Sequence, residues 1–208
     1  VRNDAYALLT LIEDQFAYRD QFEGGLIPVR AELESHIPFL NSRNDLIAFS
    51  QRAFHSLQDH HSITGSGLQD AYGLVPSFAD LWIEKVGDRF LIEDVRKGSP
   101  ALKAGVRPGC ELNAIDGQSI TDAIETFVGP TGTAIDERRE AYVARVLATG
   151  RRDRVRRLGL TCEDLSWTIE LPNLYQARLK RDPGLVAAET RVVGQQTIGI
   201  VRFNDSLG

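Results

Sequence analysis

Three histidines and one aspartate lie close together in the chain and could bind a metal ion. Asp59, His60 and His61 are consecutive, and His55 lies four residues before Asp59. Imidazole nitrogens and carboxylate oxygens are ordinary zinc ligands, but neighbouring residues of an extended segment point to opposite sides. Only two of these side chains could readily share one ion. We therefore predict no metal site, and we expect His61 to hydrogen-bond to local backbone.

Two serines could act as nucleophiles in amide hydrolysis, but neither has the surroundings that this chemistry needs. Ser66 lies between two glycines, yet Thr64 and Leu68 occupy the positions where a nucleophile elbow has glycine. Ser206 lacks the glycine-rich turn that would expose it. A reactive serine needs a positioned base and oxyanion donors. We assign no catalytic residue to this chain.

A basic cluster is the one feature that points to nucleic acid. It consists of Arg151, Arg152, Arg154, Arg156 and Arg157, interrupted by Asp153. No aromatic residues interleave with it, and the net charge of −5 opposes phosphate binding. The pattern favours a solvated surface segment and no nucleic-acid partner.

The two cysteines, Cys110 and Cys162, are too few for a disulfide framework. They lack the CxxC spacing of a cysteine zinc site. One disulfide between them stays open as an alternative, so the sequence leaves the redox compartment undecided. We predict no cofactor.

The composition is that of a folded protein. The chain has 208 residues, of which 42% are hydrophobic, 8% aromatic and 25% charged, and this excludes disordered, collagen-like and coiled-coil classes. No apolar stretch reaches 18 residues and no secretory leader is recognisable, so we predict no membrane segment. Methionine is absent and the first residue is Val1. We expect the sequence to be a piece of a longer protein.

The elements that would position any site change character near residue 70. Before it, apolar residues recur at helical spacing and predict three short amphipathic helices. Asn3 or Asp4 would cap the first, Pro28 would begin the second, and Ser42 with Asp45 would form a capping box for the third.

Beyond residue 70 the pattern predicts short strands and a few helices. The expected strands are 79–86, 90–95, 111–115, 165–171, 186–193 and 197–203, and the expected helices are 99–105, 121–128 and 135–149. Gly87-Asp88 is a strong hairpin signal.

One run of residues resembles the PDZ domain. Gly98-Ser99-Pro100-Ala101 is followed by Ala104-Gly105, Pro108-Gly109 and Ile115-Asp116-Gly117, which is similar to the family phrase G-S-P-A-x-x-A-G-x-x-x-G-D-x-I-x-x-I-D-G. Cys110 lies where the phrase has aspartate. Leu112 lies where the phrase has isoleucine, which is a conservative change. The resemblance covers roughly residues 72–171, with a helical insertion at about 133–160.

This resemblance implies a groove that binds peptide C-termini by adding the peptide as a strand. The implied carboxylate loop is Tyr72, Gly73, Leu74 and Val75, the implied strand is Leu81, Trp82 and Ile83, and the implied helix residues are Ile124 and Phe127.

The flanks resemble a family of proteases. Leu57-Gln58-Asp59-His60-His61-Ser62 is similar to the phrase L-x-D-x-H-[ST] that closes the helical region of C-terminal processing peptidases, which are tail-specific serine peptidases. Ile198-Gly199-Ile200-Val201-Arg202-Phe203 is similar to the strand that opens their catalytic core. In that family the serine nucleophile and its base lie further along the chain.

The resemblances together imply an α+β fold with a helical region (1–68), a PDZ-like partly open β-barrel (70–172), and a linker with the start of a peptidase core (173–208). They imply a non-catalytic part that recognises peptide or protein C-termini, in a periplasmic or extracellular location. The alternatives are a PDZ adaptor module without protease activity, and hydrolysis by these 208 residues alone.

Overall fold

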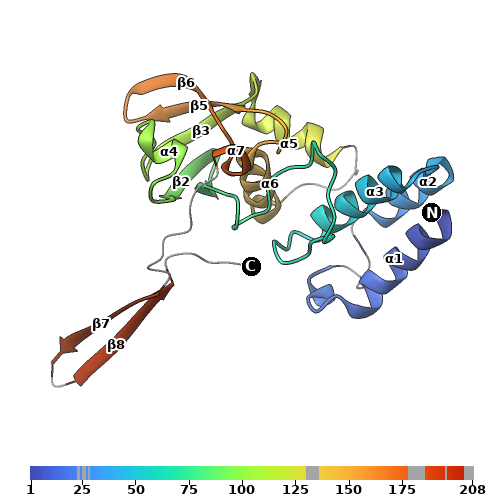
Figure 1. Ribbon diagram of the computed structural model, residues 1–208, viewed down its shortest axis with the longest axis horizontal. Coiled ribbons are helices and arrows are strands. Elements are labelled where there is room, and N and C mark those ends of the chain that lie inside the picture. Colours follow the sequence, from blue (N-terminus) through green and yellow to red (C-terminus); the bar gives the residue numbers. More distant parts are fainter. Residues whose placement is uncertain are drawn as a thin grey trace.

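The first sixty residues form the helical region that the sequence predicts (Figure 1). The computed structural model describes residues 1–22, 24, 27, 29–129, 136–177, 186–194 and 196–203. Its N-terminal elements are α1 (Arg2–Gln15), η1 (Arg19–Gln21), α2 (Arg30–His36), η3 (Ile37–Phe39) and α3 (Arg43–Ser56). Their apolar faces share a core around Leu9, Leu33 and Ile37, which are fully buried.

The helix starts agree only in part with the prediction. The capping box of α3 is confirmed, because Ser42 Oγ accepts from the Asp45 amide at 3.1 Å and Asp45 Oδ2 accepts from the Ser42 amide at 2.8 Å. The predicted cap of the first helix is wrong: α1 begins at Arg2 and places Asn3 and Asp4 inside its first turn. Pro28 and Ser206 lie outside the described residues.

An antiparallel sheet forms the second part of the molecule. Its strands are β1 (Leu81–Val86), β2 (Arg89–Val95), β3 (Glu111–Ile115), β4 (Gln118–Ser119), β5 (Arg156–Cys162) and β6 (Leu165–Leu171). The order is β1-β2-β3-β5-β6, with β4 paired to β3. Among the described residues β1 and β6 do not pair, so the sheet is open rather than closed into a barrel.

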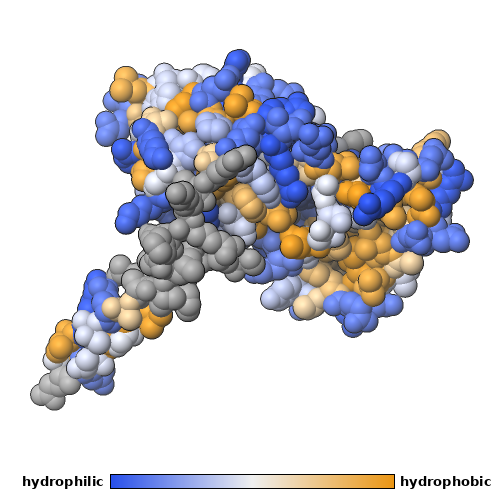
Figure 2. Space-filling view, viewed as in Figure 1, coloured by the Kyte–Doolittle hydropathy of each residue, from blue (hydrophilic) through white to orange (hydrophobic). Residues whose placement is uncertain are grey.

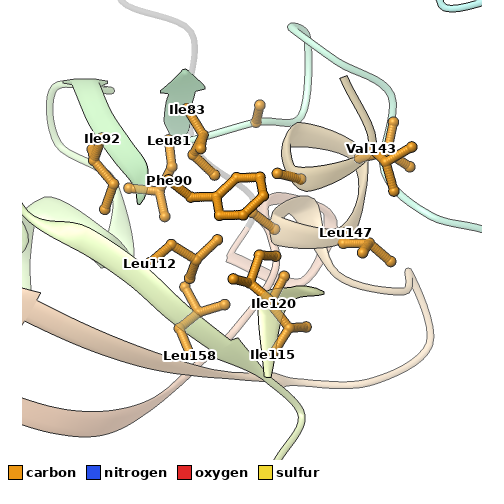
Figure 3. Close-up of a cluster of buried hydrophobic side chains, with 14 of the residues drawn as sticks. Leu81, Ile83, Phe90, Ile92, Leu112, Ile115, Ile120, Val143, Leu147 and Leu158 are labelled. Atoms are coloured by element: carbon orange, nitrogen blue, oxygen red, sulfur yellow. The ribbon is translucent and has the colours of Figure 1, made fainter. Parts of the chain in front are cut away.

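Four helices accompany the sheet, namely α4 (Pro100–Lys103), α5 (Ile120–Val128), α6 (Glu137–Thr149) and α7 (Leu174–Ala177). The ring of Phe90 lies at the centre of the core, with Leu81 and Ile83 of β1 on one side and Leu112 and Leu158 on another (Figure 3). Val143 and Leu147 bring α6 into the same cluster. The core therefore fixes α6 directly on the sheet.

The segment after α6 differs most from the sequence-based expectation. The inserted helix ends at Thr149, and residues 156–160 belong to β5, which lies between β3 and β6 in the sheet. Arg156 is buried, which corrects its assignment to a solvated basic segment, whereas Arg154 and Arg157 are exposed. Charge patterning alone cannot identify a buried arginine, because its partner is distant in sequence.

Arg156 forms a buried ion pair with Asp80. Arg156 Nη2 lies 2.5 Å from Asp80 Oδ2, and both side chains are at most 1% exposed. Asp80 Oδ2 also accepts from the Ala101 amide at 3.4 Å, and Arg156 Nη1 donates to the Ala148 carbonyl. The pair thus links the segment before β1, the start of α4, the end of α6 and β5.

A disulfide joins Cys110, just before β3, to Cys162 at the end of β5. The two residues face each other because Glu111 pairs with Thr161 in the antiparallel register. The structure therefore selects the disulfide alternative that the sequence left open.

The last described strands form a separate hairpin, β7 (Val186–Val193) with β8 (Gln196–Phe203), which extends away from the rest of the molecule (Figure 1). Val192 and Val193 are 74% and 60% exposed. Across the described ranges, no helix is both long enough and apolar enough to cross a bilayer.

Two histidines mark the contact of α3 and the segment after it with α6. His55 Nδ1 lies 3.2 Å from the Tyr142 hydroxyl, and the ring of His60 stacks on Tyr142 with centroids 4.4 Å apart. Burial lowers the pKa of His55 to about 4. Burial, assisted by the nearby Arg145 charge, lowers the pKa of His60 to about 4. Both imidazoles are therefore neutral at neutral pH.

We expect Asp80→Ala to destabilise the protein by about 3–5 kcal/mol, because it leaves the Arg156 charge buried without its partner. Urea unfolding measures this change against the exposed control Asp164→Ala. The double variant Asp80→Ala/Arg156→Met should lose less stability than the single variant Asp80→Ala. Loss of less than about 1 kcal/mol in the single variant would contradict the structural role of the pair.

We expect the free energy of unfolding to decrease when the pH is lowered from 7.5 to 5.0. In this window the unfolded histidines, with pKa near 6.5, bind protons that folded His55 and His60 do not bind, so acid favours the unfolded chain. The loss should be about 2 kcal/mol per histidine at pH 5.0. Urea unfolding at both pH values should give a smaller difference for His55→Gln/His60→Gln and an unchanged one for the exposed control His36→Gln. An equal pH dependence in the double variant would exclude this source.

Candidate peptide-binding site

The predicted carboxylate loop packs against the C-terminal end of α6. The Gly73 amide donates to the Gly150 carbonyl at 3.0 Å, and the Gly73 carbonyl accepts from the Thr149 hydroxyl at 3.3 Å. A Cβ at position 73 would lie 2.9 Å from Thr149 Cβ, so glycine is required for this close approach. The Gly73 amide is already hydrogen-bonded, and a peptide carboxylate would need to displace Gly150 to use it.

The predicted peptide-pairing strand, β1, is contacted along its length by α6. Arg145 Nε donates to the Ile83 carbonyl at 2.7 Å, and Arg145 Nη2 lies 2.5 Å from Glu84 Oε1. The same guanidinium lies 4.1 Å from the centroid of the Trp82 ring. Burial lowers the pKa of Arg145, whereas Glu84 raises it. A peptide that adds to β1 must therefore compete with Arg145 for the Ile83 carbonyl.

The other predicted site residues divide between the core and a cavity wall. Val75, Leu81, Ile83 and Ile124 are at most 5% exposed and belong to the core of the sheet domain, while Leu74 is half-buried. The rings of Tyr72 and Phe127 meet edge to face with centroids 5.6 Å apart. Trp82 has different neighbours, namely Arg145 and His60. Tyr72 and Phe127 thus lie together in the wall of a cavity, which the predicted groove did not include.

That place is a cavity of about 710 Å³ between the helical region and the sheet domain. Its wall includes Leu33 of α2, Phe49 of α3, Phe127 of α5 and Val143 of α6. Figure 2 shows apolar side chains gathered on the helical part of the molecule, at the right of the view. Sequence reasoning missed this cavity because it forms only where two separately predicted regions pack together.

Charged groups lie in the cavity wall as well. Arg151 lies over Tyr72, with its guanidinium carbon 4.6 Å from the ring centroid. Burial raises the pKa of Tyr72, and the Arg151 charge opposes this rise. Arg139 of α6 also lines the cavity, and burial lowers the pKa of its guanidinium. Arg139 precedes Val143 by one helical turn, and this spacing on an apolar face is the signal that could have identified it.

The Asp59 segment forms a turn after α3. Asp59 Oδ1 accepts from the His61 amide at 3.0 Å and contacts the His61 ring at 3.1 Å, while Oδ2 accepts from Ser62 at 2.8 Å. The expected bond of His61 to local backbone is replaced by these bonds to the Asp59 carboxylate. In the part of the chain that the structure describes, no three His, Cys, Asp or Glu side chains are arranged to hold a metal ion.

Comparisons with known proteins give structural likenesses at low identity. No protein-family model and no curated protein matches the chain. Among solved structures, mature CPAF is similar with a TM-score of 0.45 and 15% identity, over 96% of this chain and 46% of that one. A CPAF mutant gives 0.46 and 19%, over 83% and 34%. A photosystem II D1 C-terminal processing protease gives 0.35 and 14%, over 97% and 52%. The chain thus spans about half or less of the length of these solved chains.

Proposed function

We propose that this chain is the non-catalytic, peptide-recognising part of a C-terminal processing serine peptidase. In this proposal residues 70–172 form a PDZ domain that binds the C-termini of substrates. A peptidase core outside residues 1–172 then cleaves the bound polypeptide.

The observation that carries the proposal is how the PDZ-like phrase folds. Ser99 Oγ accepts from the Leu102 amide at 3.1 Å and caps α4, which follows β2 directly. Gly105 and Gly117 adopt φ values of +98° and +88°, which favour glycine. The phrase then runs through β3 and ends in the turn before β4. Ser99 therefore caps a helix and the two glycines lie at positions with positive φ, which supports the resemblance of this phrase to the PDZ domain.

Two further features agree with the proposal. The β7–β8 hairpin exposes Val192, Val193 and Val201, and a two-stranded ribbon is marginally stable alone, which favours its inclusion in a larger sheet. The Cys110–Cys162 disulfide favours an oxidising compartment, such as the periplasm or the extracellular space.

The proposed recognition site is the β1 edge. Strand addition there would supply main-chain hydrogen bonds to the peptide, and the half-buried Trp82 would contact its side chains. Because Arg145 already binds the Ile83 carbonyl, peptide binding requires this arginine to move. Arg145 therefore lowers the affinity of the β1 edge for peptides.

We expect peptides with apolar C-terminal residues to bind with dissociation constants in the micromolar range, roughly 1–100 μM, because a short added strand buries little area. Arg145→Ala should tighten binding severalfold by freeing the Ile83 carbonyl, and Arg157→Ala, which removes an exposed charge, should not. Isothermal titration calorimetry with free and amidated peptides measures both effects. Equal affinity for the two peptide forms, or no change in Arg145→Ala, would contradict recognition of C-termini at this edge.

The peptidase assignment has its own test. The gene that encodes this chain should continue, after Gly208, into a glycine-rich serine segment and a lysine or other base. The purified 208 residues should not hydrolyse a fluorogenic peptide. An open reading frame without such a segment would leave the adaptor alternative, and turnover that Ser206→Ala abolishes would favour an active fragment.

A further inference from the structure

Arg139 is a buried cation without a partner in the part of the chain that the structure describes. Its side chain is 7% exposed and lines the cavity between the helical region and the sheet domain. Its backbone amide donates to Asp136 Oδ1 at 2.7 Å, but its guanidinium makes no hydrogen bond or ion pair to a described residue. The guanidinium nitrogens are not sealed from solvent, so their donors stay available to a ligand that enters the cavity.

The other charged groups of the cavity wall are already engaged. Asp45 caps α3, Arg52 pairs with Glu32, Arg151 binds Asp70, and Asp116 accepts from the Arg157 amide. His36 and His55 are hydrogen-bonded to the Glu32 carbonyl and the Tyr142 hydroxyl. Among these charged lining residues, Arg139 alone makes no side-chain hydrogen bond or ion pair to a residue that the structure describes.

The carboxylates near Arg139 are engaged by other groups. The charges of Asp136 and of the half-buried Glu32 both act on Arg139. Glu32, however, forms its ion pair with Arg52. Asp136 is exposed and is engaged as the N-cap of α6. Arg139 also lies in the first turn of α6, where the helix dipole adds partial positive charge.

The rest of the wall is largely helical and carries both apolar and polar side chains. Apolar lining residues include Val29, Leu33, Leu40, Phe49, Val128 and Leu147. Helical backbone is hydrogen-bonded internally, so most of this wall offers no strand edge to a peptide main chain. A volume of about 710 Å³ is within the range of small-molecule sites, which runs from about 300 to 1,000 Å³.

We propose that this cavity binds an alkyl carboxylate, with the carboxylate on Arg139 and the alkyl chain among the apolar side chains of the helical region. This site goes beyond the proposed function, and it is separate from the β1 edge that would bind peptides. A carboxylate can accept two parallel hydrogen bonds from an arginine, which supplies the missing partner. The alkyl chain would lie along the apolar part of the wall.

The test uses decanoate as the probe and decanol as its uncharged analogue. Isothermal titration calorimetry with the 208-residue chain should show saturable binding of decanoate. Arg139→Met should weaken that binding by about tenfold or more, because it removes the charge-assisted hydrogen bonds. Arg138→Met is the matched control, since it removes the same charge from the exposed neighbouring position of the same helix. It should bind decanoate as tightly as the parent chain.

A second measurement separates loss of a ligand contact from loss of the fold. Arg139→Met should unfold at the same or a higher temperature than the parent chain, because it removes no hydrogen bond or ion pair between the guanidinium and a described residue. In ¹⁵N-labelled protein, decanoate should shift the amide resonances of Phe127 and Val143. Arg145→Ala should leave the affinity for decanoate unchanged, which keeps this test independent of the peptide site.

Three results would overturn the proposal. Decanol could bind as tightly as decanoate, decanoate could bind Arg139→Met as tightly as the parent chain, or the parent chain could bind no decanoate. A marked fall in the unfolding temperature of Arg139→Met would also count against it, because it would give Arg139 a structural partner. Failure of any of these tests would leave peptide binding at β1 unaffected.

Discussion

The buried ion pair of Asp80 and Arg156 is the constraint on which the sheet domain depends. Two charges that are at most 1% exposed are tolerable only when each is close to the other and hydrogen-bonded further. Arg156 meets this condition through the Ala148 carbonyl, and Asp80 through the Ala101 amide. Gly150 permits the approach, since a Cβ there would lie 2.9 Å from Arg156 Cβ. The end of α6, the start of α4, and β5 are therefore positioned together.

Fixing the C-terminal end of α6 determines what the rest of that helix reaches. Six residues separate Arg145 from Arg139, so the two arginines lie in different turns of the helix. Arg145 reaches β1, where it binds the Ile83 carbonyl and Glu84, while Arg139 reaches the cavity beside the helical region. The β1 edge that we propose for peptide binding and the cavity are separate places, but α6 borders both. Its apolar residues Val143 and Leu147 belong to the same core as Phe90 and Ile83.

Local signals in the sequence were enough to predict most elements, and non-local contacts account for what was missed. The hairpin at Gly87-Asp88, the Ser42 capping box and the bounds of β3 and β6 depend on residues within a few positions of one another, and the structure has them as predicted. β5 was missed because Arg156 and Arg157 suggested a solvated segment. The burial of Arg156 depends on its ion pair with Asp80, which lies 76 residues earlier in the chain. The cavity was not predicted for the same reason. The residues of its wall are distant in sequence, and no single segment of the wall indicates a cavity.

Arg145 and Arg139 of α6 differ in the partners of their guanidinium groups. Arg145 is satisfied by a carbonyl, a carboxylate and an aromatic face, so its burial is explained by the contacts that it makes in the chain itself. Arg139 is at least as buried, but its guanidinium has none of these partners among the described residues. Local conflicts of this kind concentrate at functional sites, because selection for stability alone would remove them. The unpartnered arginine therefore points to a ligand more directly than the apolar groove residues do, because the core accounts fully for Leu81, Ile83 and Ile124.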